Sequence, residues 1–340
     1  MKLITFAVPS YNSEGYLNHC VDTLLTGGED VEIIIVNDGS KDRTAEIANA
    51  YAAAHPSIVR AAHKENGGHG SGVNKGLELA TGLYYKVVDS DDWVDTGALQ
   101  ELIETVKKHI QEGNSPDLYI TNFIYDRVHD NAFFIRKYTD NFPANSFCTW
   151  KDAKKFDTSS VLLMHSLMYR TEVLRRSGTV LPEHTFYVDN IFAYKPLPYV
   201  KTIFYLDVNL YHYFIGRSDQ SVTMSNIVKR YKQQLKVMEH MLDAHSYADI
   251  MKMDKGFRRY MFHNLNVIMI NTLMFTLGER SSARKKDMKD LWQRLKKKDI
   301  KLYRKLRFRG YPALIYLFGP FKGKVLVLGY KYYRKKLKLG

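Results

Sequence analysis

"KVVDSDDWVD", residues 86–95, decides the fold, because a mostly apolar run from Tyr84 to Val88 leads directly into a cluster of acids. The run is typical of a buried strand, and the cluster that follows it holds Asp89, Asp91 and Asp92. Three carboxylates within four positions repel one another unless a positive charge lies among them.

Two interpretations account for this cluster. In the first, a turn leads into a helix, and Asp92 or Asp95 is the N-cap that accepts hydrogen bonds from the first amides. In the second, a divalent cation binds there, since Mg²⁺ and Mn²⁺ take oxygen ligands and often connect carboxylates to phosphates. Because one cap needs only one carboxylate, the cluster favours a cation that carries a diphosphate.

The segments before the cluster alternate between strand-like and helix-like patterns. Apolar runs predict strands at residues 3–8, 31–36, 57–62 and 83–88. Helices are predicted between them, at residues 14–25, at 41–54 with Ser40 as the cap, and from a glycine-rich loop at 66–72 to residue 80. Continuous rather than alternating apolar strands indicate an α/β fold, a Rossmann-like and mostly parallel sheet with helices on both faces.

In such sheets ligands bind at the carboxyl ends of the strands. Polar residues follow three of the predicted strands, at residues 9–12, 37–41 and 89–92. We therefore expect these three segments to meet at one edge of the sheet.

Three further residues suggest a nucleotide at this edge. Asp38 can accept hydrogen bonds from a base or ribose, or it forms a turn with Gly39. Tyr11 can lie against a base, or it packs at the end of a strand. Asn66 and the glycines after it offer amides to phosphate, or they form a flexible connection. Together the three outline a nucleotide-diphosphate site.

These segments resemble family 2 glycosyltransferases of the GT-A fold over roughly residues 1–110. The resemblance is carried by VPSYNSE (8–14), EIIIVNDGSKDRT (32–44), NGGHGSGVNKGLELATG (66–82) and VVDSDDW (87–93). It implies an enzyme that uses a nucleotide-diphosphate sugar, usually a UDP-sugar, and inverts the anomeric centre.

The resemblance also implies roles by position. The metal, Mn²⁺ or Mg²⁺, would be held by Asp91, Asp89 and Asp92, and Asp89 and Asp91 form the D-x-D motif. The residues that it places at the nucleotide sugar are Pro9, Tyr11, Asn12, Asp38, Asn66, Lys75, Asp89, Ser90 and Arg217.

Within residues 1–110 the sequence departs from the family at two places. Asn37 stands where the family often has Asp. Gly72, Val73 and Asn74 stand where it often has Ala-Arg-Asn, and that Arg normally helps to hold the nucleotide. His69 and Lys75 are the candidate substitutes for it.

The chemistry also requires a general base, which removes a proton from the attacking hydroxyl. LPEHTFYVDNIFAY (181–194) resembles the family's region for this base, with Val188 in place of its first acid and Asp189 kept. We predict Asp189 as the base, with Glu183 in reserve. The alternative for Asp189 is an N-cap of a helix that begins at Asn190.

Two other segments are candidates. In YHYFIGRSDQSVT (211–223), Arg217, with Gln220 and Ser221, forms either a clamp on the diphosphate or a solvent-exposed loop. His165 either lines the acceptor site or is a core histidine with satisfied hydrogen bonds.

The rest of the chain predicts a division into two parts. Strands are predicted at residues 117–125 and 132–138, with two more within 200–215, and helices follow from about residue 226. We expect a GT-A domain over 1–225, with a nucleotide-sugar half at 1–110 and an acceptor half at 111–225. A helical, basic region would occupy residues 226–340.

Positive charge is concentrated at the end of the 340-residue chain. Residues 281–340 hold 20 Lys and Arg against three acids, a net charge of +17, which leaves −3 for the other 280 residues. The short apolar clusters at 313–318 and 325–330, flanked by aromatic and basic side chains, suit insertion among lipid headgroups. Plain packing on the domain is the alternative, and the acidic edge of the sheet argues against nucleic acid.

The sequence thus predicts a glycosyltransferase that takes a nucleotide sugar and extends a glycan or lipid-linked acceptor in surface polysaccharide synthesis. Two cysteines, no signal peptide and no spanning segment suggest a cytoplasmic protein, peripheral on the inner face of the membrane. A polyprenyl-phosphate sugar synthase is the alternative within the class. A sugar nucleotidyltransferase and a basic nucleic-acid-binding protein are more remote.

Overall fold

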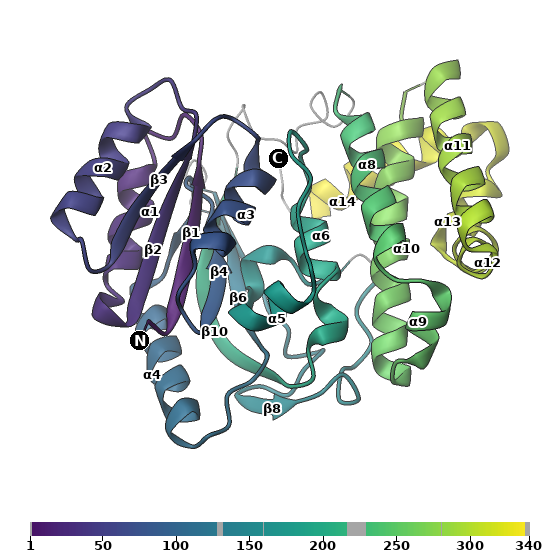
Figure 1. The fold of residues 1–340 in the computed structure, drawn as a ribbon. Coiled ribbons are helices and arrows are strands. Elements are labelled where there is room, and N and C mark those ends of the chain that lie inside the picture. The colour runs from purple at the N-terminus through teal and green to yellow at the C-terminus, as the bar shows by residue number, and fades with distance from the viewer. Residues whose placement is uncertain (1, 128–131, 159, 216–228, 280, 337–340) are drawn as a thin grey trace. The chain divides into compact units, whose positions relative to one another are not determined.

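The computed structural model describes residues 2–127, 132–158, 160–215, 229–279 and 281–336. The chain forms two compact units, the first from residues 1–152 and 162–214 and the second from residues 153–161 and 215–340. Each unit has its own elements, shown by colour and label in Figure 1.

The first unit is built on one ten-stranded sheet. Its strands are β1 (Ile4–Ser10), β2 (Val31–Asp38), β3 (Val59–Lys64), β4 (Tyr84–Val87), β5 (Trp93–Val94), β6 (Leu118–Arg127), β7 (Ala132–Arg136), β8 (Ser146–Cys148), β9 (Leu167–Arg170) and β10 (Ile203–Phe214). Their order is β3-β2-β1-β4-β9-β6-β10-β5, with β7 beside β6 and β8 beside β10. Strands β1 to β4 are mutually parallel, β10 is parallel to β6, and the remaining pairs are antiparallel.

Helices cover this sheet. They are α1 (Leu17–Leu25), α2 (Thr44–Ala54), α3 (His69–Leu79), α4 (Thr96–Gln111), α5 (Thr171–Arg176) and α6 (Asp189–Tyr194). Figure 1 shows α1 and α2 on one side of β1–β3 and α3 on the other. The expected α/β fold with helices on both faces is confirmed. The expected parallel arrangement holds for β1–β4, but the antiparallel pairs of β5, β7, β8 and β9 make the sheet as a whole mixed rather than mostly parallel.

The sheet buries its central strands completely, which explains their continuous apolar sequence. Every residue of β1, β2 and β4 is buried, including Lys86 in the middle of β4. In the parallel register Ser10 lies opposite Asn37, and Ala7 lies opposite Val87. The segments after these strands, residues 11–12, 39–41 and 88–92, therefore leave the sheet at the same edge.

Two local predictions are wrong. Residues 200–215 form one strand, β10, rather than two, because irregular pairing with β6 around Asn209 bends the chain without ending it. Ser40 does not cap α2. The N-cap is Arg43, and the Ser40 hydroxyl instead accepts a hydrogen bond from the Asn12 amide.

The second unit is helical. Its helices are α8 (Tyr231–Ala244), α9 (Tyr247–Lys252), α10 (Lys255–Leu277), α11 (Ser282–Lys298), α12 (Ile300–Arg309), α13 (Tyr311–Tyr316) and α14 (Lys322–Lys336). Helix α10 is its centre and packs against α8, α9, α11, α12, α13 and α14. No helix among the described residues is both long and apolar enough to cross a bilayer.

Candidate active site

Asp38, at the end of β2, is the anchor of the glycine-rich loop. Its carboxylate accepts hydrogen bonds from the amides of Gly67 and Gly68, at 2.9 and 2.7 Å, and forms an ion pair with Lys64 at 2.7 Å. Burial opposes ionisation, but Lys64 and the two amides outweigh it and lower the pKa of Asp38. The side-chain amide of Asn66 also donates to Asp38. Asp38 therefore fixes Asn66 and the start of α3, and a direct contact with a nucleoside stays a prediction.

The segment after β1 lies beside these residues. Pro9 is buried within β1, whereas half of the Tyr11 side chain is exposed. Asn12 has a positive φ of 51°, and its side-chain oxygen accepts from the amide of Lys41. The segment is also tied to the acidic cluster, because the hydroxyls of Ser13 and Ser90 are 2.7 Å apart. The three segments expected at one edge thus meet.

The acids after β4 have different partners. Asp95 caps α4 by accepting a hydrogen bond from the Ala98 amide at 2.7 Å, so the cap interpretation holds for this residue. It is wrong for Asp92, which is buried and accepts from the Tyr211 hydroxyl at 2.5 Å and the Phe214 amide at 2.8 Å. Burial and then the charges of Asp91 and Asp89 raise the pKa of Asp92 well above its usual range. The cluster therefore carries an unfavourable concentration of negative charge.

This donor set fits a divalent cation. Ligand atoms of Asp89, Asp92 and His165 all lie within 4.8 Å of one another. The ring of His165 packs against those of Tyr211 and Tyr213, and its buried Nδ1 has no partner among the described residues. Burial lowers the pKa of His165 to about 4, so the ring is neutral near pH 7 and can act as a ligand. Carboxylates with one imidazole suit Mn²⁺, and the buried, unpartnered nitrogen is an argument for a ligand there.

His69, the first residue of α3, lies among the acids. Its Nε2 is 2.7 Å from Oδ1 of Asp89. Burial opposes protonation of this ring, but the charges of Asp89, Asp189 and Asp91 raise the pKa of His69. The imidazole of His69 thus interacts electrostatically both with the D-x-D motif and with the predicted base. These acids are about a hundred residues apart in the sequence.

Asp189 is the first residue of α6 and not its cap, since Val188 is the N-cap. Burial raises the pKa of Asp189 to about 6, although the nearby His69 has the opposite effect and lowers it. A carboxylate with a pKa near 6 is ionised at neutral pH and still basic enough to take a proton. Glu183, the reserve candidate, is exposed.

The segment that carries Asp189 is attached to α3. The side chain of Asn74 donates to the carbonyl of Leu181 at 2.9 Å and accepts from its amide at 3.0 Å. The amide of His184 donates to the Gly67 carbonyl at 2.6 Å. His184 and Tyr187 have positive φ angles of 48° and 65°, which non-glycine residues rarely adopt and which tend to occur at functional sites. The base candidate is therefore held against the glycine-rich loop.

The departure from the family in α3 has a steric explanation. A Cβ at Gly72 would lie 2.8 Å from Cβ of Pro9, so the helix and β1 approach too closely for alanine. Val73 is buried, where a charged arginine would lose its hydration. Lys75 pairs with Glu78 on α3 at 2.6 Å, whereas His69 is the candidate substitute that lies beside the acids. Arg217, Gln220 and Ser221 lie outside the described residues.

Sequence reasoning missed three supporting residues. Tyr211 connects two acids, because its hydroxyl donates to Asp92 and accepts from the Asp89 amide at 3.1 Å. Lys86 donates to the carbonyl of His165 at 2.6 Å, and burial lowers its pKa to about 7. Asn74 was quoted only as part of a motif. Of the three, only Lys86 was recognisable from the sequence, because a lysine within an apolar strand requires a buried hydrogen-bond acceptor.

Comparison with solved structures defines the class of fold. The structure of Staphylococcus aureus TarS, residues 1–349, in complex with UDP-GlcNAc superimposes with a TM-score of 0.63. The match covers 91% of this chain and 87% of the TarS chain at 19% identity. The architecture is thus that of GT-A proteins, as the sequence predicted.

Comparison of the sequence defines the family more narrowly than the fold does. The model of glycosyl transferase family 2 matches residues 5–178, just over half of the chain, and the chain belongs to this family. The uncharacterized glycosyltransferase EpsJ of Bacillus subtilis is 31% identical over 223 residues, which are 63% of this chain and 61% of EpsJ. The minor teichoic acid biosynthesis protein GgaB of B. subtilis is 34% identical over 108 residues, 31% of this chain and 12% of GgaB. The chain thus spans less than two thirds of either relative.

Proposed function

We propose that the protein transfers a sugar from a nucleotide-diphosphate sugar, a UDP-sugar, to a glycan or lipid-linked acceptor, with inversion at the anomeric carbon. One observation carries this proposal: the charges of Asp89, Asp91 and Asp189 all act on one imidazole, that of His69. A diphosphate-binding cluster and a carboxylate of raised pKa thus share one site. The names of TarS's ligand and of GgaB support a UDP-sugar donor and a cell-surface polymer as product.

The reaction is a direct displacement. An acceptor oxygen forms a bond to the anomeric carbon while the bond from that carbon to the nucleoside diphosphate breaks, and the acceptor proton passes to the carboxylate of Asp189. Asp38, through its hydrogen bonds to Gly67 and Gly68, keeps the loop before α3 in place beside the diphosphate. His69, whose pKa the acids raise, lies 2.7 Å from Asp89 through its Nε2 and holds that carboxylate in position.

A divalent cation, when bound, supplies positive charge to the departing diphosphate. Asp89, Asp91 and Asp92 would hold it, together with His165. Tyr211 and the Phe214 amide fix the carboxylate of Asp92 by hydrogen bonds.

Calorimetry tests the donor site. UDP should bind the wild type in the presence of Mn²⁺, and both EDTA and Asp91→Ala should weaken binding at least about tenfold, because one ionic ligand of a bound cation is lost. Asp140→Ala, which removes an exposed acid of the same unit, is the matched control and should bind normally. Equal binding of UDP by the wild type and Asp91→Ala would refute a D-x-D metal site. Release of UDP from a panel of UDP-sugars then identifies the sugar.

We also propose that the C-terminal helices lie on an anionic membrane surface, where a lipid-linked acceptor would be found. Large apolar side chains on α12–α14 and the segments between them are exposed, among them Leu317 at 81% and Leu328 at 65%. They occur within the strongly basic part of the chain, and this pairing is typical of interfacial helices. In flotation assays the protein should bind vesicles that contain phosphatidylglycerol, and Leu314→Gln with Leu317→Gln should weaken binding. Unchanged flotation of this variant would contradict the proposed surface.

A further inference from the structure

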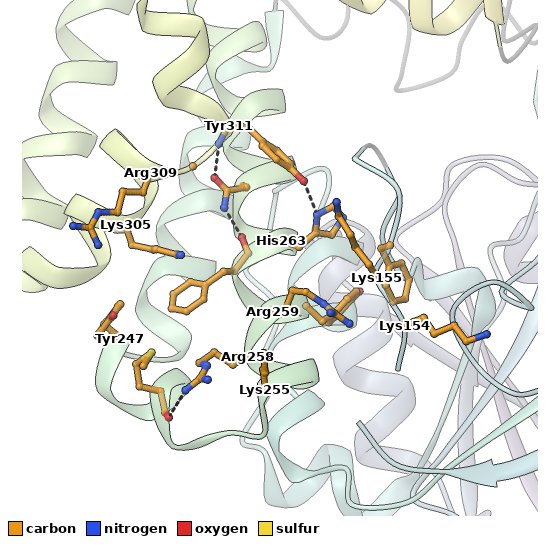
Figure 2. Close-up of a pocket in the computed structure, with 16 residues that line it drawn as sticks. Lys154, Lys155, Tyr247, Lys255, Arg258, Arg259, His263, Lys305, Arg309 and Tyr311 are labelled. Carbon is orange, nitrogen blue, oxygen red and sulfur yellow. Dashed lines mark hydrogen bonds between the residues drawn. The ribbon is translucent and has the colours of Figure 1, made fainter. Parts of the chain in front are cut away.

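The second unit contains a pocket that the transferase chemistry does not use. Its volume is about 490 Å³, a size typical of small-molecule sites. Its walls come from three separate segments, residues 154–156, the region from α9 to the middle of α10, and the end of α12 with the start of α13. Figure 2 shows the side chains that line it.

The lining of this pocket is strongly cationic. Seven of its residues are Lys or Arg: Lys154, Lys155, Lys255, Arg258, Arg259, Lys305 and Arg309. None of the described residues that line it is Asp or Glu. Asp157, outside the lining, is close enough to His263 to act on its pKa. Cations gathered around a concave surface without acids repel one another, and this repulsion is relieved when an anion binds.

Two arginines are already oriented. Arg258 donates to the carbonyl of Met251 at 3.3 Å, and Arg259 donates to the carbonyl of Ala153 at 3.0 Å. A guanidinium has five N–H donors, so a single bond to a carbonyl fixes the group and leaves donors for a ligand. Planar guanidinium groups suit the paired oxygens of phosphate.

A second part of the lining is hydrogen-bonded and electrically neutral. His263 donates from Nε2 to the Ser160 carbonyl at 2.7 Å, so its Nδ1 accepts from the Tyr311 hydroxyl at 3.1 Å. Burial lowers the pKa of His263, in agreement with a neutral ring. Asn266 accepts from the Tyr311 amide at 3.0 Å, and a Cβ at Gly310 would clash with that Asn266 oxygen. This part of the lining therefore shapes the pocket, while the surrounding Lys and Arg supply the charge.

The basic groups are spread across the pocket. In Figure 2, Lys305 and Arg309 lie on one side of the pocket, and Lys155 and Lys154 lie on the other. A single phosphate cannot contact both sides of such a volume. We propose that this pocket binds a ligand that carries two or more phosphate groups, either a soluble phosphorylated chain or a lipid headgroup. Binding here requires no residue of the transferase site.

Calorimetry with inorganic tripolyphosphate in EDTA tests the pocket, since removal of divalent metal suppresses diphosphate binding at the D-x-D acids. The full chain should bind one equivalent. The combined variant Lys255→Gln, Lys305→Gln and Arg309→Gln should bind at least about tenfold more weakly, because it removes three of the seven charges. The control variant Lys232→Gln, Lys297→Gln and Arg304→Gln removes equal charge from exposed positions outside the pocket and should bind within about twofold of wild type.

Flotation with vesicles that contain cardiolipin, whose headgroup carries two phosphates, identifies the source of the phosphates. Weak tripolyphosphate binding by the pocket variant with normal flotation would assign the pocket to a soluble phosphorylated ligand. Loss of flotation by this variant, but not by the control, would assign it to lipid headgroups. Equal effects of the two variants in both assays, or no binding of either probe by the wild type, would overturn the proposal.

Discussion

The Nε2 atom of His69 lies 2.7 Å from Oδ1 of Asp89, at the start of α3 and four residues before Val73, the position at which the resemblance to the family implies an arginine. The charges of Asp89, Asp189 and Asp91 raise the pKa of His69, which favours a positive charge beside the acids at a different position on α3. His69→Gln should weaken Mn²⁺-dependent UDP binding about tenfold, because the neutral amide cannot supply this charge. Calorimetry checks it, with His55→Gln at the end of α2 as the control. If both variants bound UDP like the wild type, His69 would have no part in the donor site.

Asp189→Asn separates catalysis from donor binding. Transfer should fall at least about a thousandfold, because an amide cannot accept the proton, while UDP binding should stay within about threefold of wild type. Glu183→Gln should leave transfer nearly unchanged. A large loss in Glu183→Gln with an active Asp189→Asn would reverse the two assignments.

The same substitution should stabilise the protein at alkaline pH. Burial raises the pKa of Asp189 from 3.8 to about 6, so the folded state favours the protonated form and its stability decreases as pH rises from about 4 to 6. A carboxamide has no such penalty, and Asp189→Asn should increase the free energy of unfolding by about 1–3 kcal/mol at pH 8. Denaturant titrations at pH 8 and pH 3.5 check this. A similar gain at both values would show that ionisation is not the cause.

Activity should have the opposite dependence on pH. The base works only when ionised, so kcat/KM should fall about tenfold per pH unit below a pKa of about 6 and level off above it. Initial rates between pH 5 and 8, at saturating metal, measure this limb. A profile that stays flat down to pH 5 would exclude Asp189 as the titrating base.

Asn74→Ala should lower kcat although we assign Asn74 no contact with the substrate. It removes both hydrogen bonds to Leu181, so the segment that ends at Asp189 loses one of its attachments to α3. We expect kcat to fall about tenfold or more with little change in UDP affinity, and the free energy of unfolding to fall by about 1–3 kcal/mol. Asn114→Ala, at an exposed position after α4, should alter neither. An equal loss of kcat and UDP affinity would indicate general unfolding instead.

The sequence predicted the sheet and the meeting of its polar segments because both depend on short-range patterns. Buried strands are continuously apolar, and parallel strands end at one edge. It did not predict that Tyr211, on β10, holds Asp92, because that contact joins positions 119 residues apart. It also misassigned the cap of α2, because the Ser40 hydroxyl accepts a hydrogen bond from the Asn12 amide instead of from an amide of the helix. Long-range hydrogen bonds leave no periodic signal in a single sequence.

The attachment of the Leu181–Asp189 segment to the glycine-rich loop restricts which segments can be exchanged between this chain and its relatives in a chimera. A Cβ at Gly68 would approach the His184 nitrogen to 3.2 Å, and the backbone there has a φ of 84°, so the loop and the segment fit each other closely. A chimera that takes residues 111–225 from a relative, to change the acceptor, must bring residues 66–74 from the same parent. Recombination that separates them would place Asp189 on a mismatched support, so we expect such chimeras to lose activity even when both parts fold.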